Sequence, residues 1–189
     1  YLPPKQELAV ALLSPGSLCT IESQTRVRDF DVLAFSVSFE WDYTNVLSML
    51  RLAGLPVYAA ERGARDPLVV IGGAVTFVNP EPVALFADVV AAGEGEMLVP
   101  ALARHVRSAA TRADVLTGLA GERGFYVPSF YDVRYADNGT IEAFEARQGT
   151  GAPVPVRKAA LPASAGADPP ATSIFTPDTA FGSRLLIEV

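Results

Sequence analysis

The chain has 189 residues, of which 50% are hydrophobic and 19% are charged, and its formal net charge at pH 7 is −6. This composition can build a buried core and excludes wholesale disorder, and the acidic balance argues against nucleic acid as a partner. One cysteine and one histidine exclude a disulfide framework, a structural zinc site and a cysteine-ligated iron–sulfur cluster within this chain. No apolar run approaches the roughly 20 residues of a membrane span, and no signal peptide is recognisable, so we expect a cytoplasmic protein with no membrane partner.

Short β-type runs alternate with helix-type runs over residues 29–107, which favours a βαβ architecture. Residues 31–38 and 68–71 are apolar without strict alternation, as expected of strands that are buried on both faces. Between them, the apolar spacing of residues 46–53 predicts a helix, which Gly54 ends.

The same unit then repeats along the chain. Residues 57–60 read as a short strand, residues 80–86 as a short helix and residues 87–92 as a further buried strand, which a helix with a continuous apolar face follows. In a parallel sheet the turns after the strands lie at the carboxyl edge, where such folds bind ligands. We therefore expect one crevice at that edge.

In the second half of the chain the pattern changes. Residues 113–120 fit a short helix, and residues 125–135 alternate as a strand. An Asn138-Gly139 turn and a second strand at residues 141–144 complete a β-hairpin signal. Residues 149–173 are rich in Gly, Ala, Pro and Ser and read as a linker. The predicted fold is α/β: a Rossmann-like, mostly parallel sheet with a carboxy-terminal β-hairpin and linker.

The candidate binding residues follow the predicted strands. Gly93 and Gly95 allow the backbone to approach a ligand at a helix start, but the third glycine of a dinucleotide fingerprint is absent, so a tight turn is the alternative. The Gly72-Gly73 pair can likewise face a bulky ligand or satisfy a turn. The candidate set, which would share one crevice, is Ser36, Ser38, Gly72, Gly73, Ala74, Thr76, Gly93, Glu94 and Gly95.

Other groups offer little chemistry. Asn79 precedes Pro80 and either forms part of a rigid rim or caps the next helix. His105 has basic neighbours and reads as a surface histidine, and Cys19 as a small buried hydrophobe. Because no Ser-His-Asp, HExxH or P-loop pattern occurs, we expect no catalytic residues, no metal ligands and no catalysis by this chain alone.

Five runs occur in an order that is typical of one family. They are Phe30–Ser36, Asp42–Leu47, Ile71–Gly73, Asn79–Pro82 and Gly93–Glu96, and the pattern continues through Tyr126–Tyr131. Together they resemble the amino-terminal cobalamin-binding-like domain of radical S-adenosylmethionine (radical SAM) proteins. In such proteins a strand ending in Glu-Val leads into the cysteine triplet that holds the iron–sulfur cluster, and Leu186-Ile187-Glu188-Val189 fits that strand.

The resemblance implies a division of the chain into three parts. Residues 1–110 would be the cobalamin-binding-like Rossmann domain, with its first βα unit truncated, and residues 111–148 a helix and β-hairpin extension. Residues 149–189 would be a linker that leads into a radical SAM domain, the partner that holds the iron–sulfur cluster and S-adenosylmethionine.

The resemblance also implies a cofactor site and a function. Ser36-x-Ser38, Gly72-Gly73-Ala74 and Gly93-Glu94-Gly95 resemble the loops that line cobalamin, whereas the Asp-x-His-x-x-Gly motif of a cobalt-ligating histidine is absent. The expected role is that of a non-catalytic module of a radical SAM enzyme, which holds cobalamin or substrate over the cluster domain. The alternatives are a scaffold of the same fold that has lost cofactor binding, and an independent nucleotide-binding protein.

Overall fold

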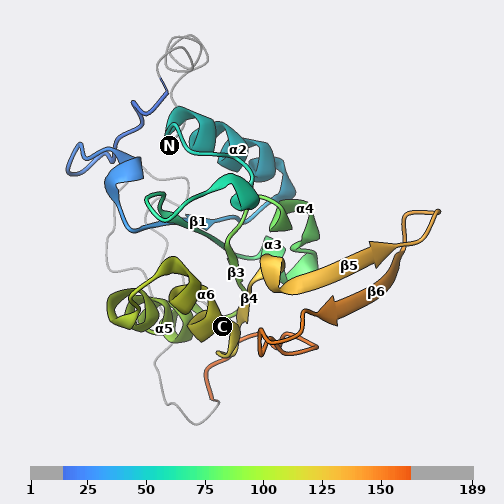
Figure 1. The fold of residues 1–189 in the computed structure, drawn as a ribbon. Helices are drawn as coiled ribbons and strands as arrows, with labels where there is room; N and C mark the ends of the chain where they lie inside the picture. The colour runs from blue at the N-terminus through green and yellow to red at the C-terminus, as the bar shows by residue number, and fades with distance from the viewer. Residues whose placement is uncertain (1–14, 163–189) are drawn as a thin grey trace, which may run out of the picture.

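A four-stranded sheet lies at the centre of the chain in this computed structural model, which describes residues 15–162 (Figure 1). The strand order is β1-β2-β3-β4, with the first three strands parallel and β4 antiparallel to β3. The strands are β1 (Val32–Ser36), β2 (Leu68–Gly72), β3 (Val89–Ala91) and β4 (Phe125–Tyr126). The predicted α/β fold with a mostly parallel sheet is confirmed.

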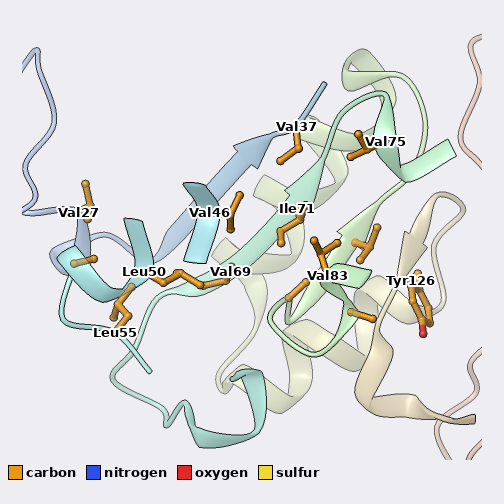
Figure 2. Close-up of a cluster of buried hydrophobic side chains, with 14 of the residues drawn as sticks. Val27, Val37, Val46, Leu50, Leu55, Val69, Ile71, Val75, Val83 and Tyr126 are labelled. Carbon is orange, nitrogen blue, oxygen red and sulfur yellow. The ribbon is translucent and has the colours of Figure 1, made fainter. Parts of the chain in front are cut away.

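Helices cover both faces of the sheet. They are α2 (Tyr43–Leu52) on one face, and α5 (Gly95–Ser108) and α6 (Arg112–Ala120) on the other (Figure 1). Side chains of β2 alternate between the faces: Val69 and Ile71 pack in the α2 cluster, whereas Leu68 and Val70 pack with α5 and α6. Figure 2 shows the α2 cluster, where Val69 and Ile71 lie close to the helix. Burial on both faces explains why the strand reads as a continuous apolar run.

Short helical turns make up several of the connections. They are η1 (Val27–Asp29), η2 (Glu40–Asp42), η3 (Ala59–Glu61), α3 (Val75–Val78), α4 (Glu81–Ala84) and η4 (Pro128–Phe130). The strand predicted at residues 57–60 is wrong, because this segment enters η3. Arg62 Nη1 donates to the carbonyl oxygens of Pro56 at 3.0 Å and Val57 at 3.2 Å, and these bonds hold the segment outside the sheet.

The predicted β-hairpin is confirmed. It consists of β5 (Tyr131–Tyr135) and β6 (Ile141–Ala146), which form a separate antiparallel sheet and project from the body of the molecule (Figure 1). The single strand predicted over residues 125–135 is divided, however, into β4, η4 and β5. Pro128 lies at the break, since it has no N–H to donate to a strand ladder.

Two residues of the predicted linker, Arg157 and Ala159, form backbone hydrogen bonds with the chain beside β3 and β4. Ala159 is buried; its N–H donates to the Ala92 carbonyl at 2.9 Å, and its carbonyl accepts the Glu94 N–H at 3.2 Å. The Gly124 N–H donates to the Arg157 carbonyl at 2.8 Å. The linker beyond residue 162 and the strand predicted at residues 185–189 lie outside the described residues. Within the described part of the chain, no helix has the length and apolar character needed to cross a membrane.

Candidate functional site

The carboxyl ends of the parallel strands bring the predicted loops to one edge of the sheet. Ser36 pairs in register with Gly72, and Ile71 pairs with Val90 one residue before the end of β3. The turn that contains Gly93 therefore leaves the sheet beside the two preceding loops. The carboxyl edge thus carries residues from all three loops, as the strand pattern predicts.

The predicted residues at this edge differ in how far they are exposed to solvent. Ser36, Ser38, Ala74, Glu94 and Gly95 are exposed, Gly72, Gly73 and Gly93 are half-buried, and Thr76 is buried. The Thr76 hydroxyl donates to the Gly73 carbonyl at 2.7 Å, so it supports the turn. The exposed members therefore offer the most surface to a ligand in this arrangement.

Two glycines of the predicted site are required by the fold itself. Gly73 has a φ of +97° and Gly93 a φ of +142°, a region of backbone conformation that favours glycine. A Cβ atom on Gly73 would overlap the backbone of Val37, and one on Gly93 would overlap the backbone of Ala159. Close approach of the chain to itself therefore accounts for both glycines.

Gly95 differs from both, because a Cβ atom there would have no neighbour within 4 Å.

Asn79 has a local role. Its Oδ1 accepts the Glu81 N–H at 3.1 Å, as expected if this residue caps the following helix.

His105 lies in the last turns of α5, and its imidazole ring contacts the carboxylate of another side chain. Its Nε2 is 3.1 Å from Glu122 Oε1, and its side chain is 21% exposed. Hydrogen bonds from His105 and from Arg104 lower the pKa of Glu122, against the opposing effect of burial. The histidine is thus part of a contact between α5 and the end of α6.

A pocket of about 900 Å³ lies at the amino end of β3, away from the predicted residues. Its walls come from the η3 loop, α4, the start of α6, the β4–η4 connection and the hairpin. The lining residues include Ala60, Arg62, Glu81, Ala84, Leu85, Asp88, Arg112, Leu116, Tyr126, Tyr131 and Tyr135, and none of the predicted site residues. Sequence reasoning missed this pocket because its walls come from segments far apart in the chain.

A buried charge cluster lies beside the pocket. Asp88 Oδ2 accepts the Arg62 Nε–H at 3.0 Å and the Val69 N–H at 2.8 Å, and it lies 2.6 Å from Arg112 Nη2. Arg62 also donates to the Phe86 carbonyl at 2.6 Å. Burial lowers the pKa of Arg62, and the charge of Asp88 partly offsets this effect. The cluster contains two guanidinium groups and one carboxylate.

Two tyrosines complete the wall, and the hydroxyl of each donates a hydrogen bond within the protein. The Tyr126 hydroxyl donates to Glu81 Oε1 at 2.9 Å, and the Tyr131 hydroxyl donates to the Pro153 carbonyl at 2.8 Å. Burial raises the pKa of both hydroxyls, and the neighbouring Glu81 raises that of Tyr126 further. The Tyr131 ring stacks on Phe144 of the hairpin, and the Tyr126 ring is tilted against both, so these contacts join β5 and β6 to β4.

Comparison with known proteins identifies the family. A family model described as "Radical SAM proteins, N-terminal" matches residues 1–128. The chain belongs to this family. The match covers the whole central sheet and ends at Pro128, before the hairpin. No curated protein and no solved structure gives a significant match.

Membership in the radical SAM N-terminal family implies a companion radical SAM domain in the same protein. Among residues 15–162, no group of three or more His, Cys, Asp or Glu side chains is arranged to hold a metal ion. The loops at the carboxyl edge and the pocket at the amino end of β3 are two features of the described residues that could contact a ligand.

Proposed function

We propose that the chain is the non-catalytic N-terminal module of a radical SAM protein and that its carboxyl-edge loops hold cobalamin or substrate over the cluster domain. The family match supports the first part of this proposal. The second part rests on the edge itself, where three loops meet and a parallel α/β sheet binds its ligands.

One observation carries the proposal: large apolar side chains are exposed beside the polar loop residues. Phe39 is 66% exposed, Trp41 88% and Val78 77%. They follow β1 and β2, and the Tyr43 hydroxyl donates to the Asn79 carbonyl at 3.3 Å, which joins the two connections. If these side chains form one contiguous apolar surface, they are typical of sites that bind a ligand or a partner.

In this proposal cobalamin would contact some of the predicted residues at the edge and not others. Ser36, Ser38, Ala74 and Gly95 are open to contact, whereas Gly73 and Gly93 are covered by the protein backbone. Cobalamin would supply the cobalt chemistry when bound, and the residues of this edge would bind and orient it. Because His105 is paired with Glu122, no histidine of the described part of the chain would be available to ligate cobalt.

Titration with cobalamin tests the proposal, because a bound corrinoid adds strong visible absorbance to the protein. We expect saturable binding by the chain, which Ala74→Trp weakens about tenfold or more by covering the edge. Ala110→Trp, at another exposed alanine outside the edge, is the matched control and leaves binding unchanged. The same tryptophan variants can be titrated with a candidate substrate in place of cobalamin.

The second candidate is a scaffold that has lost cofactor binding, and the contact of Ala159 with Gly93 favours it. This contact places the chain's own backbone on one of the three loops. The absence of cobalamin and substrate binding by the unmodified chain would support the scaffold. In that case, hydrogen exchange of residues 36–45 should still slow when the radical SAM domain of the same protein is present.

A further inference from the structure

The pocket at the amino end of β3 is a candidate site that the proposed function does not use. Its volume of about 900 Å³ lies within the range of small-molecule sites. The body of the domain supplies one side of it, through η3, α4 and α6, and the hairpin supplies the other, through Tyr131, Val133 and Tyr135. A molecule bound there would therefore contact both parts of the chain.

Apolar side chains make up much of the wall. Ala60, Ala84 and Leu116 line the side that the body supplies. Two larger side chains of the wall remain in contact with solvent, since Leu85 is 68% exposed and Tyr135 is 57% exposed. An occupant that covers them removes apolar surface from water, which favours a ligand with an apolar body.

The buried charges of the wall are already paired within the protein. The Arg62 side chain is 0% exposed, and it donates to Asp88 and to backbone carbonyls. Arg112 Nη2 lies 2.6 Å from Asp88, and its Nη1 donates to the Asp66 carbonyl at 3.0 Å. Burial lowers the pKa of Arg62, and the negative charges of Asp88 and Asp66 oppose this effect. The two guanidinium groups are therefore balanced by carboxylates of the protein itself.

The other charged side chains of the wall also have partners within the protein. The Glu81 carboxylate accepts the Tyr126 hydroxyl at 2.9 Å, and Arg147 pairs with Asp132 at 2.8 Å. An ion that enters an apolar site gives up its hydration, and it gains little where the charges around it are already paired. An uncharged ligand has no such cost, so the chemistry of the wall favours one.

We propose that this pocket binds an uncharged small molecule of a few linked or fused rings that is apolar over most of its surface. The site is separate from the carboxyl edge, so it does not depend on cobalamin binding, and either proposal can fail without the other.

Phenylnaphthylamine, an uncharged dye that fluoresces more strongly in an apolar site, tests the proposal in the full 189-residue chain. Ala60→Trp and Ala113→Trp place a large side chain on the η3 wall and on the α6 wall of the pocket, at alanines that are exposed. Ala74→Trp adds the same side chain at an exposed alanine of the carboxyl edge and is the matched control. Circular dichroism establishes that each variant keeps the fold.

We expect one dye molecule to bind per chain, and each pocket variant to weaken binding about tenfold or more, because the indole ring fills space that the dye needs. Ala74→Trp should leave binding unchanged. The proposal is wrong if the folded chain does not bind the dye, or if Ala74→Trp weakens binding as much as the pocket variants do.

Competitors that share one naphthalene ring test the charge of the ligand. Naphthalenemethanol is uncharged, naphthalenesulfonate is an anion and naphthylmethylammonium is a cation. We expect the alcohol to displace the dye at concentrations about tenfold lower than either ion requires, because only the ions must give up a charged hydration shell. An ion that competes as well as the alcohol would overturn the assignment of an uncharged ligand.

Discussion

The two ends of the central sheet build their surfaces from the chain in different ways. At the carboxyl edge, the predicted residues follow their strands directly, and the fold brings them together because parallel strands end at one side. At the amino end of β3, the pocket joins Arg62, Asp88 and Arg112, which come from separate elements. Local sequence patterns therefore reveal the first surface, whereas only the folded chain reveals the second.

The largest expected effect tests whether the charge cluster organises the amino end. Asp88→Asn removes the only carboxylate that contacts both Arg62 and Arg112 in the described structure. We expect a loss of about 3–5 kcal/mol in the free energy of unfolding, because a buried positive charge loses its partner. Urea denaturation measures this loss from the midpoint and slope of the transition.

The matched control is Asp132→Asn in the hairpin. Asp132 pairs with Arg147 at 2.8 Å, but the two side chains are 62% and 53% exposed. Removing such a pair changes stability by less than about 1 kcal/mol. Equal losses in the two variants would contradict a structural role for the buried cluster, and the contrast between the two ends of the sheet would then disappear.

The next effect concerns the glycines of the carboxyl edge. Gly73→Ala forces a side chain onto a backbone with a φ of +97° and against Val37, so we expect a loss of about 2 kcal/mol or more. Gly95→Ala is the matched control: no atom lies within 4 Å of the new Cβ, and the change should stay within about 0.5 kcal/mol. Thermal or urea unfolding of both variants measures the difference. If Gly73→Ala kept full stability and lost only ligand binding, the glycine would serve the ligand rather than the turn.

The sequence predicts the central sheet and the hairpin well because their signals are local. The apolar run of β2 reflects burial on both faces, and Asn138-Gly139 marks the hairpin turn. It fails at residues 57–60, where Arg62 is held by the distant Asp88 and donates to the carbonyls of Pro56 and Val57. It also fails to divide residues 125–135, although Pro128 was a visible signal against a continuous strand.

The candidate site shows the same limit. The strand pattern places Ser36, Gly72 and Gly93 at one edge, but it cannot distinguish a glycine that faces a ligand from one that faces backbone. For Gly93 the neighbour is Ala159, whose segment reads as a linker in the sequence. The pairing of Asp88 with two arginines also depends on long-range contacts, and no spacing in the sequence indicates it.

The smallest expected effect concerns the contact between α5 and the end of α6, which belongs to neither functional surface. Because the pKa of Glu122 is lowered in the folded chain, its carboxylate stabilises the fold above the pKa it has when unfolded. This contribution is lost as the pH falls through the lowered folded value. The Glu122 side chain is 37% exposed, so the effect is screened and stays below about 1 kcal/mol.

We expect Glu122→Gln to lose less stability than the unmodified chain between pH 7 and acidic pH, as measured by urea unfolding at each pH. Glu145→Gln, which removes a looser and more exposed pair with Arg134 at 4.0 Å, is the control for the loss of a surface carboxylate. Equal pH dependence in the Glu122→Gln variant and the unmodified chain would show that the contact with His105 and Arg104 contributes nothing to stability.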